Sequence, residues 1–146
     1  MLTISPTPVA LANRLRPVLL QLARELRREL APLGITGGQA ALLAAIRKHP
    51  GIGVGGLAER EGVSAPVMSG YVARLEGAGL VRRTQSPDDR RRFGLTITDD
   101  GARILRSARS RRTAWLAARL ERLPDADRAA IDAALEPLER LLEASE

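Results

Sequence analysis

The chain has 146 residues, 45% of them hydrophobic, and a net charge of +6. This size predicts one domain with appended helices that can bury a core. The absence of cysteine excludes a disulfide framework, a thiolate metal site and a thiol redox sensor. No apolar run is long enough to span a membrane, and the N-terminus lacks the apolar core of a signal peptide. We therefore expect a cytoplasmic protein without membrane contact.

The positive charge is concentrated in one part of the chain. Residues 82–119 contain eleven arginines and four aspartates, whereas residues 121–146 contain three arginines and eight acidic residues. Positive charge gathered in one stretch is typical of a surface that faces phosphate groups. The charge pattern therefore favours an anionic partner such as nucleic acid.

Two helices are predicted in the first third of the chain. After a short loose tail, leucines at helical spacing predict a long helix over 9–31, which Pro17 should kink or restart. Thr36 and Gln39 have the spacing of a capping box. They predict the start of a second helix that runs through Lys48.

A pair of short helices joined by a tight turn is predicted over 56–77. The first is closed by Gly62, because glycine readily enters a left-handed turn. Ser64 is a good N-cap for the second helix, and Pro66 fits its first turn, where a missing N–H costs nothing. The second helix is expected to bury four residues at helical spacing, which are Val67, Tyr71, Val72 and Leu75.

A basic β-hairpin is predicted directly after these helices. Two strand-like runs, 80–85 and 92–98, are joined by the turn SPDDRR, and residues 52–54 are expected to add a very short third strand. The hairpin tip carries Arg90, Arg91 and Arg92. A helix that fits the major groove, next to an arginine-tipped loop that fits the minor groove, predicts a DNA-reading unit.

Two further helices are predicted after the hairpin. Thr98 is expected to cap a helix over 99–123, and a last helix follows Pro124 with an apolar face of Ile131, Ala134, Leu135, Leu138, Leu141 and Leu142. A winged helix alone cannot cover the apolar faces of the first helix and these two. We therefore expect a homodimer around a two-fold axis, whose recognition helices, about 34 Å apart, contact a palindrome.

These elements predict a mainly α fold with a small β-hairpin wing (α+β), in which a winged helix-turn-helix is flanked by dimerisation helices. We expect a single domain over 1–146. Its DNA-binding region is expected at 36–98, and its helical dimerisation region at 9–34 plus 99–146.

Ten residues are predicted at a DNA interface. Arg91 is the first choice for a minor-groove contact, with Asp89 orienting its guanidinium or that of a neighbour. The alternative is a solvated arginine turn that contacts nothing specific. Met68 has two interpretations, contact with a thymine methyl or filling of the core. The full set is Ser64, Ala65, Pro66, Met68, Ser69, Arg74, Asp89, Arg90, Arg91 and Arg92.

Trp115 is the only tryptophan, and it is expected either to line a ligand pocket or to pack in the dimer core. Any effector is expected to be a small organic anion, because the helix that carries Trp115 is rich in arginine. A lone histidine, His49, does not make a metal site and is expected at a helix C-terminus. No catalytic triad, carboxylate pair or phosphate-cradling loop occurs, so we expect neither an enzyme nor a cofactor.

One motif resembles a known family. Asp89-x-Arg91, followed after five residues by Ile97-Thr98, is similar to the D-x-R-x5-L-T wing motif of the MarR family of bacterial transcription regulators, with Ile in place of Leu. The runs 75–83 and 30–39 also resemble that family, and the resemblance covers nearly the whole chain. It implies a homodimeric winged-helix repressor or activator that a small, frequently aromatic or anionic, ligand often releases from DNA. The glycines at 55, 56 and 70 depart from good helix-forming sequence.

The leading hypothesis is therefore a homodimeric, sequence-specific DNA-binding transcriptional regulator, a repressor on a palindromic operator. The alternative is a winged-helix module that binds an acidic protein partner, since such a partner would suit the same arginines. An enzyme is a third class, for which the sequence offers no residues.

Overall fold

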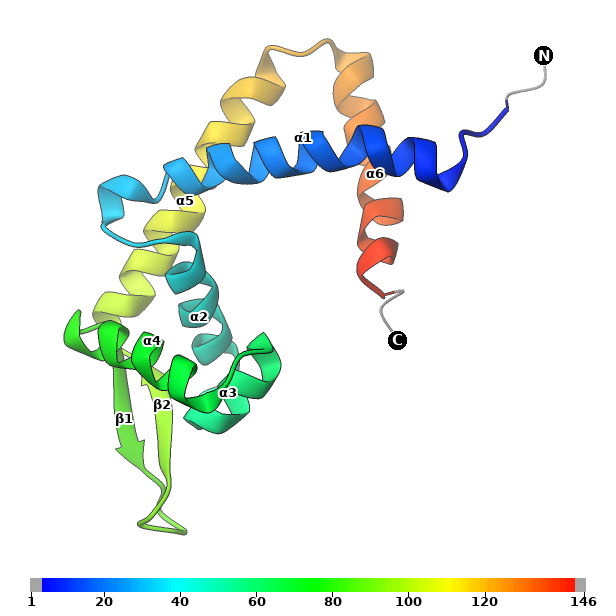
Figure 1. Cartoon of the computed structure of the whole chain (residues 1–146). Helices are drawn as coiled ribbons and strands as arrows, with labels where there is room; N and C mark the ends of the chain where they lie inside the picture. The colour runs from blue at the N-terminus through cyan, green and yellow to red at the C-terminus, as the bar shows by residue number, and fades with distance from the viewer. Residues whose placement is uncertain (1–3, 144–146) are drawn as a thin grey trace. The chain divides into compact units, whose positions relative to one another are not determined.

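The computed structural model describes residues 4–143 (Figure 1). In chain order the elements are α1 (Pro8–Arg28), η1 (Ala31–Leu33), α2 (Gly37–Lys48), α3 (Val54–Glu61), α4 (Ala65–Gly77), β1 (Val81–Gln85), β2 (Phe93–Ile97), α5 (Asp99–Glu121) and α6 (Asp125–Glu143). The chain divides into two compact units, and the boundary lies within α5 between Arg111 and Arg112. A mainly helical fold with a two-stranded hairpin confirms the predicted fold class.

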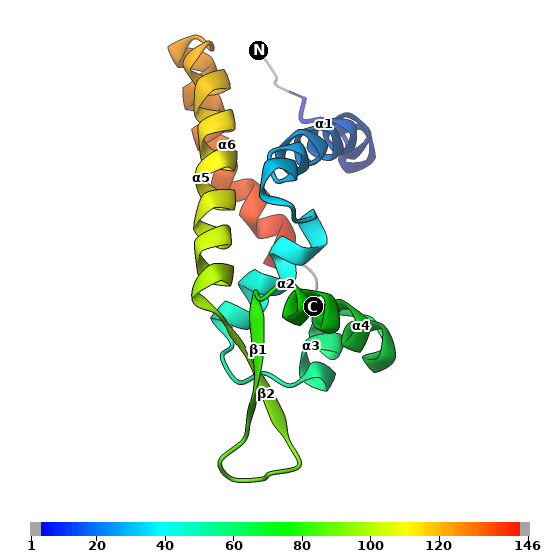
Figure 2. The same cartoon turned by 90° about the vertical axis from the view of Figure 1, so that its left-hand side faces the viewer.

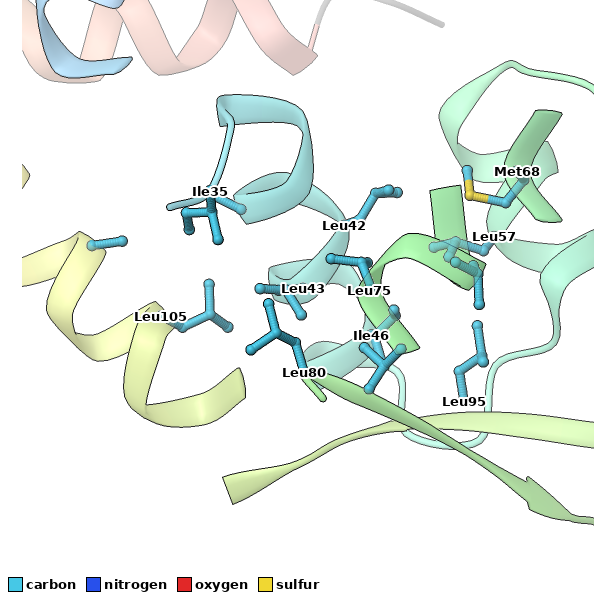
Figure 3. Close-up of a cluster of buried hydrophobic side chains, with 14 of the residues drawn as sticks. Ile35, Leu42, Leu43, Ile46, Leu57, Met68, Leu75, Leu80, Leu95 and Leu105 are labelled. Atoms are coloured by element: carbon cyan, nitrogen blue, oxygen red, sulfur yellow. The ribbon is translucent and has the colours of Figure 1, made fainter. Parts of the chain in front are cut away.

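The core of the first unit lies between α2, α3, α4 and the hairpin. Figure 3 shows side chains from all of these elements converging, with Leu105 of α5 at one end. The fully buried large residues are Leu30, Leu43, Ile46, Leu57, Met68, Val72, Leu75 and Leu95. Because helices and hairpin share one core, the orientation of α4 relative to the hairpin is fixed by packing.

Local signals set the start of α2. Thr36 Oγ1 accepts a hydrogen bond from the Gln39 N–H at 3.1 Å, and Gln39 Oε1 accepts one from the Thr36 N–H at 2.9 Å. This reciprocal pair is the predicted capping box. His49 is the C-cap residue of α2, as expected, and its Nε2 atom is buried without a hydrogen-bond partner within the described residues.

At Pro17 the sequence predicted either a kink or a restart of α1. The helix continues through this proline to Arg28, so the restart that the sequence offered there does not occur. Proline removes one backbone hydrogen bond and frees the carbonyl of Asn13, four residues earlier. Both residues are exposed, so water can satisfy that carbonyl and the helix tolerates the loss.

The hairpin is an antiparallel pair in which Val81 lies opposite Ile97 and Gln85 lies opposite Phe93. The predicted third strand at 52–54 is reduced to a single bridge between Ile52 and Leu95, because α3 already begins at residue 54. In Figure 2 the hairpin projects beyond α3 and α4. The hairpin is therefore anchored at its base and free at its tip.

The base of the hairpin is joined to both α4 and α5. Thr98 Oγ1 donates to the Gly79 carbonyl at 2.7 Å and accepts from the Gly101 N–H at 3.1 Å, so it caps α5 as predicted. A Cβ atom at Gly101 would lie 2.2 Å from the Leu80 carbonyl oxygen. This close approach requires glycine at 101 and holds the start of α5 against the chain that enters β1.

The helices at the two ends of the chain carry much exposed apolar surface. Neither α1 nor α6 has a buried residue within the described part of the chain. The exposed large apolar residues include Leu11, Val18, Leu19, Leu20 and Leu22 on α1, and Ile131, Leu135, Leu141 and Leu142 on α6. Within residues 4–143, no single helix has the length and apolarity needed to cross a membrane, and only the bent pair Pro8–Leu33 with Gly37–Lys48 meets both conditions together.

In the second unit, Arg128 closes the turn between α5 and α6. Its guanidinium donates to the carbonyl oxygens of Leu120, Glu121 and Leu123 at 3.3, 3.4 and 3.0 Å, and it pairs with Asp125. These carbonyls lie at the end of α5, where they have no partner within the helix. One side chain thus fixes the end of α5 and the start of α6.

Candidate nucleic-acid interface

The turn between α3 and α4 positions the recognition helix α4. Gly62 ends α3 with φ at 68°, the left-handed conformation that glycine adopts without strain. Ser64 is the N-cap of α4, and its Oγ atom accepts from the Val67 N–H at 3.4 Å. Pro66 lies in the first turn, as predicted. The two helices therefore form the predicted helix-turn-helix.

The buried face of α4 differs from the predicted one. Met68, Val72 and Leu75 face the core, whereas Val67 and Tyr71 are 45% and 41% exposed. The helix is rotated so that Met68 takes the inward position that helical spacing predicted for Val67. The base contact predicted for Met68 is therefore wrong, because this side chain has no exposed surface and fills the core instead.

The other predicted residues of α4 remain accessible. Ser64, Ala65, Pro66 and Arg74 are exposed, and Ser69 is half-buried. The N-terminal turns of a recognition helix are the part that usually contacts base edges. This surface offers few hydrogen-bonding groups and is mostly apolar, with Arg74 farther along as the single cation of α4.

Main-chain hydrogen bonds close the wing tip. The Ser86 N–H donates to the Arg92 carbonyl at 2.8 Å, and the Arg92 N–H donates to the Asp89 carbonyl at 3.0 Å. Gln85 Nε2 donates to the Arg90 carbonyl at 2.7 Å. These bonds hold residues 86–92 as a defined turn, and the three arginines of the tip are exposed.

Asp89 acts mainly on the backbone of the tip. Its Oδ1 atom accepts from the Arg91 N–H at 3.0 Å, while its Oδ2 atom lies 3.9 Å from Nε of Arg92. Of the two expectations for this carboxylate, the structure brings it to a neighbour's guanidinium and not to that of Arg91. The Arg91 guanidinium has no hydrogen bond or ion pair within the described residues, so it remains available to a partner.

An ion pair that the sequence analysis did not anticipate links the helix to the wing. Arg83 Nε lies 2.6 Å from Glu76 Oε1, which joins the last turn of α4 to β1. The side chains are 36% and 32% exposed. The two residues are seven positions apart with a turn between them, so neither helical nor strand periodicity reveals the pairing.

A cavity of about 390 Å³ lies beside the recognition helix. Its lining includes Gln39 and Leu42 of α2, Val63 before α4, and Met68, Tyr71 and Arg74 of α4. Glu61 and Arg74 add one carboxylate and one guanidinium to this largely apolar lining, which suits a small ligand that has an apolar body and a polar group.

Trp115 lies in the second unit, half-buried on α5. Arg119 stacks on its ring, with the guanidinium carbon 3.6 Å from the ring centroid. The guanidinium therefore covers one face of the indole in a cation–π interaction. Whether Trp115 lines a ligand pocket stays a prediction.

Sequence comparison relates this chain to helix-turn-helix regulators. The model of the MarR family matches residues 35–93, which span α2 to the start of β2. An uncharacterised HTH-type transcriptional regulator of Mycobacterium bovis is 31% identical over 118 residues, covering 81% of this chain and 82% of that protein. The HTH-type transcriptional repressor MdtR of Bacillus subtilis is 34% identical over 77 residues, 53% of this chain and 50% of that protein.

Solved structures share the fold over almost the full length. RV1404 from Mycobacterium tuberculosis has a TM-score of 0.84 at 24% identity and covers 99% of each chain. A point mutant of Staphylococcus aureus MepR, solved bound to an oligodeoxyribonucleotide, has a TM-score of 0.71 at 20% identity and covers 90% of this chain and 96% of that one. At these identities the likeness concerns the fold, which includes the helices outside the winged unit.

Proposed function

The chain belongs to the MarR family of transcriptional regulators, and from this premise we propose that it acts in the bacterial cytoplasm as a homodimeric repressor on a palindromic operator. The family consists of DNA-binding regulators and not of enzymes, so the enzyme hypothesis is set aside. Membership of this family makes double-stranded DNA the partner of the chain. We propose four further properties, which are a homodimer, a palindromic operator, repression, and release by a small ligand.

The exposed apolar faces of α1 and α6 carry the proposal of a homodimer. Leucines that are between 39% and 81% exposed recur on both helices. Apolar surface of this kind is stabilised by removal from water, at about 25 cal/mol per Å². A second copy of the chain is the simplest cover, because an isologous interface repeats the same face on both subunits.

A homodimer then gives the form of the operator. Each subunit supplies one α4 and one arginine-tipped wing, so two-fold symmetry presents two identical reading units to DNA. Half-sites about one helical turn apart, roughly 34 Å, suit such a pair. We therefore propose an inverted repeat rather than a direct one.

Repression and release by a ligand complete the proposal. Over 77 residues the chain is similar to a protein named as a repressor, which supports repression rather than activation. A ligand can release the dimer only if it binds the DNA-free arrangement more tightly than the DNA-bound one. The cavity beside α4 meets this condition if DNA engages Arg74, since one guanidinium cannot serve both a phosphate and a polar group of the ligand.

The test combines mass and DNA binding. Light scattering of the purified protein should give the mass of two chains, and gel shift with DNA from upstream of its own gene should give one specific complex. A protein that has the mass of one chain and still forms the specific complex would overturn the dimeric part of the proposal. A dimer that binds no upstream DNA would overturn the operator part.

A further inference from the structure

Gly70 lies in the middle of the recognition helix, five residues after its first residue and seven before its last. Glycine is among the least favourable residues in a helix interior, because it loses more backbone freedom on folding than alanine. A glycine at such a position therefore needs a reason. The usual reason is a neighbouring atom that leaves no room for a side chain.

The protein itself supplies no such neighbour within the described residues. A Cβ atom built at Gly70 meets nothing within 4 Å, whereas one at Gly101 would lie 2.2 Å from the Leu80 carbonyl and one at Gly94 would lie 2.7 Å from the Gly51 carbonyl. The backbone of Gly70 is also not left-handed, since the positive-φ glycines are Gly34, Gly51, Gly62 and Gly79. Neither packing nor conformation within the described chain requires glycine at 70.

The surroundings of Gly70 place it on the outward face of α4. Met68, Val72 and Leu75 point to the core, and Gly70 is exposed on the other side of the helix. Its neighbours one turn away, Val67 and Arg74, are exposed as well. This is the face that a major groove would receive.

We propose that Gly70 is the point at which the backbone of α4 approaches base edges in the major groove, and that its missing side chain is a determinant of operator specificity. The inference rests on the proposed function in that it requires an operator which α4 enters. The space above the Cα atom is then filled by DNA in the complex. A methyl group at 70 holds the helix away from the base edges that Val67 contacts.

Stability and operator binding should then respond to Gly70→Ala in opposite directions. The variant should unfold at a temperature higher by about 2 °C, because alanine favours the helix. Its affinity for the operator should fall about tenfold, as expected when a base contact is lost. Its affinity for a random duplex should stay the same, because contacts to phosphate carry non-specific binding.

The matched control is Gly55→Ala in α3. Its Cβ atom would also lie in open space, in the first turn of α3 and outside the recognition helix. It should raise the unfolding temperature and leave operator affinity unchanged.

The experiment measures fluorescence anisotropy with a duplex that the wild-type protein selects from a random pool, and with a scrambled duplex. A tenfold loss for Gly70→Ala on the selected duplex alone, with Gly55→Ala at the wild-type value, supports the inference. An unchanged affinity of Gly70→Ala, or an equal loss on both duplexes, overturns it while the proposed function stands. If the wild type selects no sequence, the proposed function fails and the inference fails with it.

Discussion

Glu76 in the last turn of α4 and Arg83 in β1 form the ion pair that joins the recognition helix to the wing, with 2.6 Å between Oε1 and Nε. Thr98 adds a second connection at the same end, through its hydrogen bond to the Gly79 carbonyl between the two elements. The helix and the hairpin therefore hold a fixed relative orientation. Such rigidity lets one subunit contact a major groove and the adjacent minor groove together.

A double-mutant cycle on Glu76→Ala and Arg83→Ala tests this connection. Because both side chains are about one third exposed, solvent screens the pair and the coupling energy in unfolding should be small, about 0.5–1 kcal/mol. The two substitutions should also be non-additive in operator affinity, since either one removes the same link between α4 and the wing. Strict additivity in both measurements would show that the pair does not orient the wing.

Arg91→Ala should weaken operator binding by about 1–3 kcal/mol and leave the unfolding temperature and the dimer unchanged. The reason is that its guanidinium is exposed at the wing tip and carries no structural contact within the described residues. Arg122→Ala, which removes the same charge from an exposed site after α5, is the control and should bind as the wild type does. Equal affinities of the two variants would remove the wing from the interface.

Asp89→Asn and Asp89→Ala separate the shape of the wing tip from its charge. Asparagine keeps an Oδ1 atom that can accept from the Arg91 N–H, whereas alanine leaves this N–H without its partner. We expect Asp89→Asn to retain most of the operator affinity and Asp89→Ala to lose about 1 kcal/mol of binding free energy. If both variants lose the same affinity, charge and not turn geometry is the role of Asp89.

Removal of residues 124–146 should produce aggregates or monomers that no longer bind a palindrome, because it strips α6 and exposes more apolar surface. A milder change is Leu135→Glu, which places a charge on the apolar face, where Leu135 is 50% exposed in the single chain. Ala133→Glu, on the opposite side of the same helix, is its control. Sedimentation should show dissociation for Leu135→Glu alone, and a dimer for both variants would place the interface elsewhere.

Operator binding should weaken steeply as salt rises, because arginine–phosphate contacts release counterions from DNA. Arg74→Ala should reduce the slope of log affinity against log salt by about one per site, if Arg74 contacts a phosphate. A slope that stays at the wild-type value would show that Arg74 does not contact a phosphate. Its role would then lie in the cavity that it lines beside α4.

Features that depend on a few adjacent residues could be predicted from the sequence. The capping box of Thr36 and Gln39, the left-handed Gly62 and the N-cap Ser64 all formed as expected, because each is a short-range hydrogen bond or backbone preference. The wing and its exposed arginines followed from turn chemistry in the same way.

Features that depend on distant packing could not be predicted. A small rotation of α4 against α2 and α3 decides whether Met68 or Val67 faces the core. Helical spacing alone does not predict this rotation. The Glu76–Arg83 pair and the Arg128 cap also require the folded turns between their elements. Helix α1 continues through Pro17 because the Asn13 carbonyl that the proline leaves unpaired is open to water. The sequence pattern does not show this exposure.

The central claim is that two copies of this chain bind one palindrome through α4 and the wing. The most direct measurement is the stoichiometry and affinity of the protein on a selected duplex with both half-sites, compared with the same duplex in which one half-site is scrambled. We expect two chains per intact duplex, and a loss of affinity of at least about 100-fold when one half-site is scrambled. One chain per duplex, or equal affinity for the intact and the half-scrambled DNA, would contradict it.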